Sequence, residues 1–234
     1  MVLSLVLVAV ALVGRVVHRI IGGPTVRIRV ISVAGLHTLP KQTVIRSSGI
    51  QLGDSLYWIN TGQIERRLLT LPGVAAARVE ADFPHRLLIR ITERQPKLFI
   101  THGSKVFYLD QERVVFQSAR RSTNGLTCVV GVKASKHDLG KVLRTEHADT
   151  AFTVWHGLRR LNLKASIISL TNHRLSARLY DGTEIWFGDE SDLSGKLKRL
   201  ADCWRVMRDK KQHARYVDLR LRELVTWRPR GSEG

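Results

Sequence analysis

The chain has 234 residues, a hydrophobic content of 44% and a mean hydropathy of −0.09, which argue against intrinsic disorder and allow one large domain or two smaller ones. Its 38 lysines and arginines outnumber 20 aspartates and glutamates, for a net charge of +18. So basic a surface indicates an acidic partner: nucleic acid, anionic lipid or an acidic protein. No zinc-finger spacing, basic leucine-zipper heptad or aromatic RNA-binding signature accompanies the charge, so a nucleic-acid partner is not expected.

The chain opens on an uninterrupted apolar run, MVLSLVLVAVALVG, which RVVHRII follows. As a helix, about 13 apolar residues reach roughly 20 Å, short of the ~30 Å hydrocarbon core, whereas a helix continued to Ile21 spans it with its cations near one interface. We therefore expect a single-pass membrane anchor over residues 1–22, whose cytoplasmic lead-in is very short or precedes the present first residue. Such a lead-in would place the residues after the anchor outside the cytoplasm. The arginines that follow the apolar run favour the opposite orientation, with those residues in the cytoplasm, and a basic tail ahead of Met1 would reverse that preference.

Two other interpretations of the apolar run stay open. A cleaved signal peptide is one, because Ala9-Val10-Ala11 resembles a cleavage site, although no basic region precedes the run and the cleaved peptide would be unusually short. A buried core helix is the other, since the run alone is short for a membrane span.

The next stretch predicts a strand followed by two helices. In VRIRVISV, the residues Val26, Ile28 and Val30 alternate with arginines, as in a half-buried strand. A short helix is expected to open near Thr38–Pro40 and to close at Ser47-Ser48-Gly49. A second helix is expected from Thr61 to Leu71, where Pro72-Gly73 ends it.

A β-hairpin is predicted within VEADFPHRLLIRITERQP. Alternation places Glu80 and Asp82 on one face of the first strand, opposite Arg90 of the second. Such carboxylates can serve acid–base chemistry, but no apolar pocket that would raise a pKa is evident around them. We interpret Glu80, Asp82 and Glu93 as solvated surface charges of a scaffold, without a catalytic role.

The remainder alternates short strands with two helices. PKLFITHGSKVFYLDQERVVF reads as three strands, GLTCVVGV as a further apolar stretch, and ASIISLTNHRLSARLYDGTEIWFG as three more strands. One helix is expected from Thr145 to Leu161, with Phe152, Trp155 and Leu158 on its apolar side. Another is expected from Asp192 to about Arg208, its inward residues being Leu197, Leu200, Cys203, Trp204 and Met207. RYVDLRLRELVTW closes the sequence as one or two strands.

Signatures of enzymes and of metal sites are absent from the sequence. It contains no G-x-S-x-G, H-E-x-x-H, Walker A or G-x-G-x-x-G motif, and its nine histidines are scattered. Cys128 and Cys203 do not form a C-x-x-C pair, so we expect unpaired packing residues, with a disulfide as the alternative in an oxidising compartment. We therefore expect no catalytic residue, no cofactor and no metal.

The order strand, helix, helix, strand, strand, with these particular residues, resembles the POTRA domain of the FtsQ/DivIB family of bacterial cell-division proteins. The stretches that carry the resemblance are VRIRVISVAGLHTLPKQTVI, GIQLGDSLYWIN, IERRLLTLPGVAAARVEADFPHRLLIRITERQP and YVDLRL. The resemblance covers residues 25–229, with departures at Arg113 and Thr127, where the family commonly has glycine and proline. It implies an α+β fold: a transmembrane helix over residues 1–22, a β-α-α-β-β POTRA domain over 25–95, and a mixed α/β domain over 96–230 on an extended, mainly antiparallel sheet.

The same resemblance implies a non-enzymatic scaffold in the cytoplasmic membrane, mostly extracytoplasmic and enriched at the division septum. Its partners would be an FtsB/DivIC-like and an FtsL-like protein, with other septal proteins at the POTRA domain. The partner strand would add to the C-terminal strand at Arg220, Leu221, Glu223, Val225 and Trp227. The alternative for that strand is a purely structural role, as an edge strand whose charges protect it against aggregation. Alternative functions are another POTRA-bearing membrane assembly or translocation factor, or a basic nucleic-acid-binding module.

Overall fold

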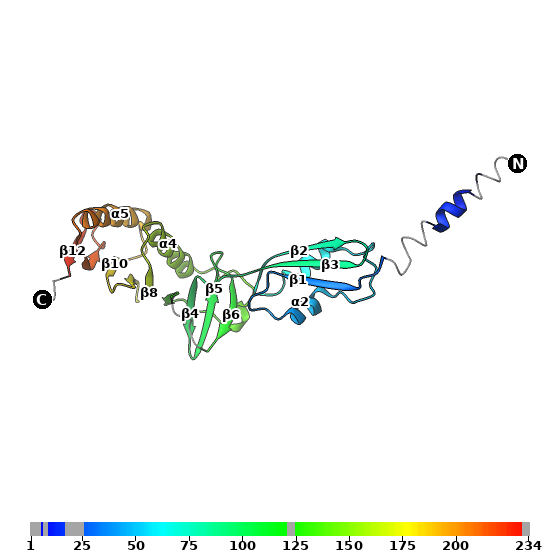
Figure 1. Cartoon of the computed structure of the whole chain (residues 1–234). Coiled ribbons are helices and arrows are strands. Elements are labelled where there is room, and N and C mark those ends of the chain that lie inside the picture. Colours follow the sequence, from blue (N-terminus) through cyan, green and yellow to red (C-terminus); the bar gives the residue numbers. More distant parts are fainter. Residues whose placement is uncertain (1–5, 7–8, 17–25, 121–124, 231–234) are drawn as a thin grey trace. The chain divides into compact units, whose positions relative to one another are not determined.

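The computed structural model describes residues 6, 9–16, 26–120 and 125–230, and the chain divides into two compact units, residues 1–94 and 95–234 (Figure 1). Residues 9–16 are helical. Within the described ranges, no helix is both long enough and apolar enough to cross a membrane. The expected transmembrane segment over residues 1–22 lies mostly outside the described residues.

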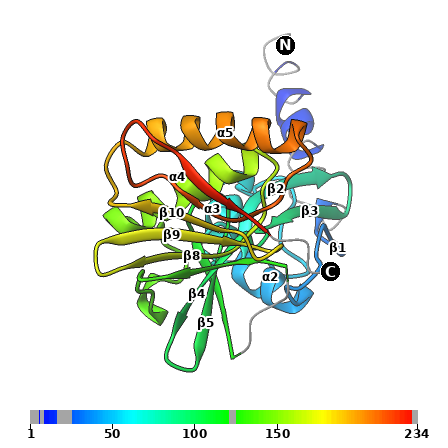
Figure 2. The same ribbon diagram turned by 90° about the vertical axis from the view of Figure 1, so that its left-hand side faces the viewer.

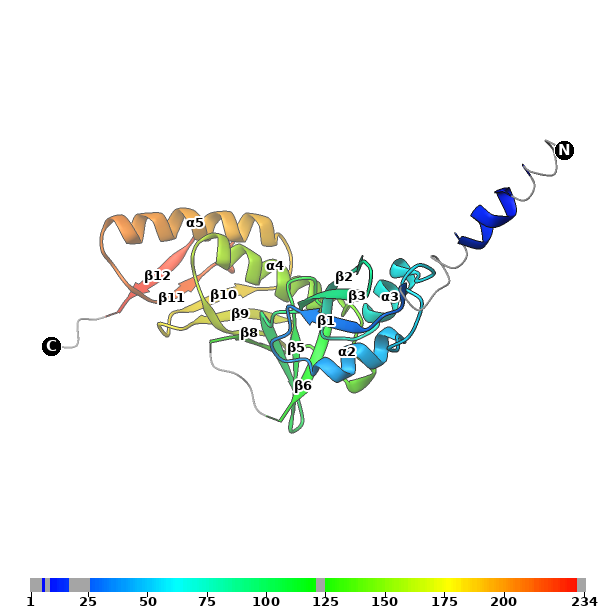
Figure 3. The same cartoon turned by 45° about the vertical axis from the view of Figure 1, so that its right-hand side comes forward.

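The first unit holds a three-stranded sheet in the order β1-β3-β2, built from β1 (Val30–Ala34), β2 (Val74–Asp82) and β3 (Arg86–Glu93). β1 runs parallel to β3, and β2 is antiparallel to it. Two neighbouring helices, α2 (Lys41–Ser48) and α3 (Thr61–Leu68), pack with the sheet (Figure 3). The element order is the expected β-α-α-β-β. Ten buried apolar residues form the core: Ile28, Val44, Leu56, Ile64, Leu68, Val74, Val79, Leu87, Ile89 and Ile91.

Two boundaries in this unit differ from the sequence prediction. The first strand begins only at Val30, whose side chain is 47% exposed, although alternation predicted it to be buried. Residues before it take other partners: Arg27 forms an isolated antiparallel bridge with Ser55. Helix α3 ends at Leu68 instead of Leu71 because turns ahead of Pro72 close it early.

The carboxylates of the β2–β3 hairpin largely behave as surface charges. Glu80 forms an ion pair with Arg90 at 2.6 Å across the hairpin, and both side chains are about half exposed. Asp82 lies opposite Arg86, not Arg90, with 3.7 Å between charged atoms. Exposed pairs of this kind contribute little to stability.

Replacing Glu80 by Gln and Asp82 by Asn is therefore expected to lower the free energy of unfolding by less than about 1 kcal/mol. Urea titration of the double variant beside the wild type measures the difference. A loss well above this limit would show that one of these carboxylates has a structural role that its exposure does not reveal.

The interpretation of Glu93 as a surface charge is wrong. Its carboxylate is buried, and the residue is only 6% exposed. Its Oε1 accepts hydrogen bonds from the backbone N–H groups of His37 at 2.7 Å and Leu39 at 3.0 Å. Its Oε2 accepts from the Thr38 N–H at 2.9 Å and the Thr38 hydroxyl at 2.6 Å. Burial raises the pKa of Glu93, but these hydrogen bonds outweigh it and lower the pKa to about 2. Glu93 thus holds the β1–α2 loop to the end of β3.

The second unit contains one sheet in the order β12-β11-β10-β9-β8-β7-β4-β5-β6. Its elements are β4 (Leu98–His102), β5 (Lys105–Leu109), β6 (Val115–Ala119), β7 (Thr127–Val130), a 3₁₀ turn (Lys136–Asp138), α4 (Glu146–Arg160), β8 (Ala165–Thr171), β9 (Arg174–Leu179), β10 (Glu184–Gly188), α5 (Leu193–Asp209), β11 (Ala214–Asp218) and β12 (Thr226–Pro229). Three neighbouring pairs are parallel, β4 with β7, β7 with β8 and β10 with β11, and the other pairs are antiparallel. The sheet is therefore mixed.

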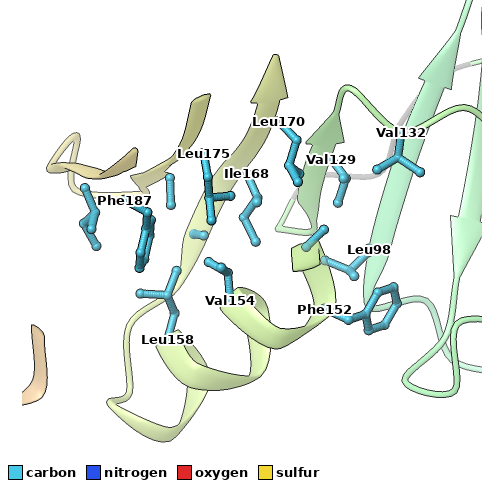
Figure 4. Close-up of a cluster of buried hydrophobic side chains, with 14 of the residues drawn as sticks. Leu98, Val129, Val132, Phe152, Val154, Leu158, Ile168, Leu170, Leu175 and Phe187 are labelled. Carbon is cyan, nitrogen blue, oxygen red and sulfur yellow. The ribbon is translucent and has the colours of Figure 1, made fainter. Parts of the chain in front are cut away.

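Helices α4 and α5 lie along one face of this sheet (Figure 2). The side chains of Thr145 and Asp192 cap their N-termini, at the residues where the sequence predicted the helices to begin. Figure 4 shows Phe152, Val154 and Leu158 of α4 pointing into the core of the sheet. The strands contribute Leu98, Val129, Ile168, Leu170, Leu175 and Phe187 to that view, and Val132 lies just after β7. Cys128 and Cys203 are free thiols, and burial raises the pKa of each.

The two outer strands of the nine-stranded sheet differ in how their edges are used. Beside β6, residues 139–143 form bridges with Val114 and Val115, so part of that edge is already paired. At the other end, β12 pairs on one side only, with β11. Within the described chain, no further strand lies beside either outer strand, and β12 lacks even the isolated bridges found at the start of β6.

Candidate functional site

The five residues predicted to bind a partner do not share one strand. Arg220, Leu221 and Glu223 lie in the loop between β11 and β12, and Val225 directly precedes β12. Only Trp227 lies on β12, opposite Val217 of β11. The structure thus brings the five together as a loop plus an edge strand. The segment forms two strands, one of the two outcomes that the sequence allowed, but the placement of all five residues on one strand is wrong because the loop turns the chain back along β11.

The crossover from β10 through α5 to β11 positions this loop. β11 returns parallel to β10, and the Leu219 N–H extends the pairing by donating to the Trp186 carbonyl oxygen at 2.9 Å. Leu219 itself is fully buried. Leu219 therefore fixes the backbone just before Arg220, the first residue of the candidate site.

Arg220 takes part in a stack of three side chains on the sheet face. Its guanidinium donates to the Asp218 carboxylate, with Nη2 to Oδ2 at 2.6 Å and Nε to Oδ1 at 2.9 Å. The same group lies 5.3 Å from the centre of the Trp186 ring, which stacks on Tyr216 at 4.5 Å and 10°. The hydrogen bonds from Arg220 lower the pKa of Asp218. The guanidinium is thus held in one orientation while remaining at the surface.

Sequence reasoning missed Trp186, Tyr216 and Asp218 as members of this site. A partial signal was present, since the alternation in Tyr216-Val217-Asp218 places the two polar residues on one face with the buried valine on the other. Nothing in the sequence indicated that Trp186, some 30 residues earlier, would join them, because the β10–β11 pairing is a long-range contact.

The apolar residues of the candidate site fall into two groups. Leu221 and Leu224 are 58% and 56% exposed and project from the loop. Val225 and Trp227 are half-buried and pack against the core of their own unit. The exposed leucines are therefore the apolar groups that a partner can cover fully.

A cavity of about 530 Å³ adjoins the Arg220 stack and is lined by nine residues: Thr171, His173, Arg174, Leu175, Ser176, Trp186, Gly188, Asp189 and Arg220. Asp189 also contacts the buried ammonium group of Lys196 on α5. The hydrogen bond from Lys196, with one from Ser191, lowers the pKa of Asp189 to about 2. Asp189 is thus ionised at neutral pH and engaged with Lys196.

Across residues 213–230 the sequence carries five arginines against two carboxylates. Of the two carboxylates, Asp218 is engaged with Arg220. The edge and its loop therefore present a basic surface with exposed leucines, which fits an acidic, partly apolar segment of another chain. No group of His, Cys, Asp and Glu suited to a metal ion occurs in the part of the chain that the structure describes.

Two family models match this chain. The POTRA domain of FtsQ type matches residues 26–94, and the C-terminal domain of the cell-division protein FtsQ/DivIB matches residues 99–220, more than half of the chain. The chain belongs to the FtsQ/DivIB family of cell-division proteins.

Individual FtsQ and DivIB proteins are similar to this chain, at identities that the following three examples illustrate. DivIB of Clostridium tetani is 21% identical over 183 residues, which cover 75% of this chain and 69% of that protein. FtsQ of Streptomyces bingchenggensis is 25% identical over 213 residues, covering 88% of this chain and 79% of that relative. FtsQ of Streptomyces coelicolor is 30% identical over 123 residues, covering 51% of this chain but only 47% of that protein.

The match to the FtsQ/DivIB C-terminal domain ends at residue 220. Arg220 is therefore the last matched position, and the loop and β12, with Leu221, Glu223, Val225 and Trp227, lie beyond it. The role of those four residues must be argued from the geometry of the edge.

Proposed function

We propose that this member of the FtsQ/DivIB family is a non-catalytic scaffold of the division septum, which binds an FtsB/FtsL-like pair of division proteins at β12. The observation that carries the proposal is the unpaired edge of β12 beside a basic loop with exposed leucines. An incoming strand gains backbone hydrogen bonds from such an edge, and side chains then provide specificity.

Each part of the site has a distinct role in this proposal. The edge of β12 sets the register of the partner strand. The guanidinium of Arg220, oriented by Asp218 and Trp186, donates a charge-assisted hydrogen bond to a partner carboxylate. Leu221 offers an apolar contact at the rim, Glu223 faces solvent, and Val225 and Trp227 support the strand from behind.

The membrane part of the proposal rests on the apolar N-terminal sequence. We propose that residues 1–22 anchor the chain in the cytoplasmic membrane and that residues from Thr25 on lie outside the cytoplasm. Other septal proteins would bind the POTRA unit. A tagged copy should gather at the septum of dividing cells, and a uniform distribution around the membrane would contradict the assignment to the septum.

Reversing the charge of Arg220 with Arg220→Glu is expected to weaken binding of the purified FtsB/FtsL-like pair by about 2 kcal/mol, roughly 30-fold in Kd. The change loses the bond to the partner carboxylate and places a second anion beside Asp218. Leu221→Asp should weaken binding in the same direction without disturbing the Arg220–Asp218 pair. Isothermal titration calorimetry measures both.

Arg205→Glu is the matched control, because Arg205 is an exposed arginine of α5 whose charge change equals that of Arg220→Glu. It should bind with the wild-type Kd. Wild-type affinity for both Arg220→Glu and Leu221→Asp, with unchanged melting temperatures, would show that the partner binds elsewhere.

A further inference from the structure

The first unit carries several large apolar side chains that are exposed to solvent. The exposed large apolar residues among positions 26–94 are Val30, Leu52, Tyr57, Trp58, Leu69 and Phe83. Trp58 is 74% exposed, and its ring packs edge-on against Tyr57 with 4.9 Å between centroids. A tryptophan this exposed is costly to leave in water without a ligand or surface to cover it.

Backbone hydrogen bonds place all of these residues except Leu69 around one segment, residues 26–30. The loop that carries Leu52, Tyr57 and Trp58 is bound to it, because the Leu56 N–H donates to the Val26 carbonyl at 2.9 Å and the Gly53 N–H donates to that of Ile28 at 2.8 Å. The turn that begins at Phe83 is bound to the same segment through the His85 carbonyl, which accepts from the Arg29 N–H at 2.8 Å.

The direction of the loop is set by the antiparallel bridge between Arg27 and Ser55. Because the two segments run in opposite directions, the chain after Ser55 heads toward the end from which residue 26 comes. Tyr57 and Trp58 therefore lie at that end. Phe83 precedes β3, which runs parallel to β1, so it lies toward the same end, whereas Leu52 precedes Ser55 and lies toward the other end of the loop. We call Tyr57, Trp58 and Phe83 the aromatic tip.

The sequence brings the aromatic tip close to the apolar N-terminal segment. Five peptide steps separate Ile21, the last residue of that segment, from Val26, and a fully extended chain covers at most ~18 Å over that stretch. If residues 1–22 span the bilayer, as proposed above, the tip lies within reach of the headgroup layer.

The chemistry of the tip suits that layer. Tryptophan and tyrosine combine an apolar ring with a polar hydrogen-bonding group, and both concentrate at membrane interfaces. Arg27 and Arg29 lie on the segment of residues 26–30, and arginine near a bilayer favours anionic lipids. Arg86, the first residue of β3, lies close by but is paired with Asp82. Of these, Arg27 already donates to the Gly53 carbonyl at 2.8 Å, which holds the loop against the segment.

We propose that the aromatic tip inserts into the headgroup layer of an anionic membrane and holds the POTRA unit against the bilayer. This inference rests on the proposed membrane anchor and adds a second attachment, made by the folded unit itself. The occupant is a lipid surface, because the tip adjoins the segment that leaves the anchor and carries arginines beside its aromatic rings.

Quenching of tryptophan emission by brominated lipid tests the proposal on the full chain. The protein is reconstituted into vesicles of phosphatidylcholine and phosphatidylglycerol, with and without bromine on the acyl chains. Trp58 is the only tryptophan before residue 95. We expect brominated lipid to reduce the emission of the wild type, and Trp58→Phe to abolish that reduction. The double change Arg27→Gln, Arg29→Gln should diminish the reduction while retaining Trp58.

Trp204→Phe is the control, since it removes one tryptophan from the second unit and should leave the bromine-dependent loss unchanged. Equal emission from Trp58 in brominated and plain vesicles would overturn the proposal and leave a protein as the occupant of the tip. Flotation separates this failure from that of the anchor. A chain that floats with the vesicles but shows no quenching contradicts the tip alone, whereas a chain that does not float contradicts both.

Discussion

Replacing Glu93 by glutamine is expected to lower the free energy of unfolding of residues 26–94 by about 3 kcal/mol. The carboxylate is buried and accepts from three backbone N–H groups and a hydroxyl in the β1–α2 loop. Glutamine keeps one acceptor oxygen but replaces the other by an amide that only donates. Donors at His37, Thr38 and Leu39 then compete for one neutral acceptor.

The effect of Glu93 should depend on pH in a defined direction. The pKa in the folded state is about 2, below the ~4.3 of glutamate in an unfolded chain. A lowered pKa stabilises the folded state at pH values above ~4.3, and this stabilisation disappears as the pH falls through about 2. The difference in stability between wild type and Glu93→Gln should therefore be full near neutral pH and should shrink between about pH 4 and pH 2.

Amide hydrogen exchange measures this prediction, because it reports on residues 26–94 separately from the second unit. Glu80→Gln is the matched control: it removes the same charge from the same hairpin at an exposed position. A Glu93→Gln variant as stable as Glu80→Gln at neutral pH would mean that the loop does not need the carboxylate.

Replacing Ile89 by aspartate is expected to unfold the first unit. Ile89 is fully buried in the central strand β3, opposite Val79 of β2 and Val33 of β1. An aspartate there either carries an unpaired charge in the core or takes up a proton at a cost, and it also loses the apolar burial of isoleucine. The sum exceeds about 5 kcal/mol, comparable with the total stability of a small domain.

Circular dichroism and hydrogen exchange should show lost protection in residues 26–94. Thr92→Asp introduces the same side chain on the same strand at an exposed position, and it should cost no more than about 1 kcal/mol. A folded Ile89→Asp protein with wild-type protection would contradict the assignment of Ile89 to the core.

Local sequence patterns predicted most of the elements, because the spacing of buried residues along a strand or a helix depends only on residues nearby in the sequence. In β3, the residues Leu87, Ile89 and Ile91 alternate with less buried ones, and in α3, Ile64 and Leu68 are buried at helical spacing. The prediction was wrong at Val30, where alternation continues but the backbone of the preceding residues is bound to a distant loop. The residue at which a strand begins or ends depends on such distant partners, which a local sequence pattern does not contain.

Glu93 shows why the roles of charged residues were harder to predict. In the sequence it is one of several carboxylates beside arginines, and its Glu-Arg-x-Pro motif does not indicate burial. Its partners at positions 37–39 lie more than 50 residues away. Only the parallel pairing of β1 with β3 brings that loop to the end of β3.

The candidate site was predicted as a set of residues but not as a geometry. The sequence placed Arg220, Leu221, Glu223, Val225 and Trp227 near a C-terminal edge, and that edge exists at β12. The half-burial of Val225 and Trp227 and the stack of Arg220 on Trp186 depend on how α5 returns the chain to β11. Those features are tertiary, so the chain order alone did not reveal them.

The unequal edges of the nine-stranded sheet have a consequence for the kind of partner that can bind there. Residues 139–143 bridge only the first residue of β6, whereas β12 has no bridge along its outer side among the described residues. A second copy of this chain is a poor match for β12, because Arg228 would meet another Arg228 or its basic neighbours, and Pro229 lacks an N–H to donate. Self-association through β12 is therefore disfavoured, and a strand bound at this edge is expected to come from another protein.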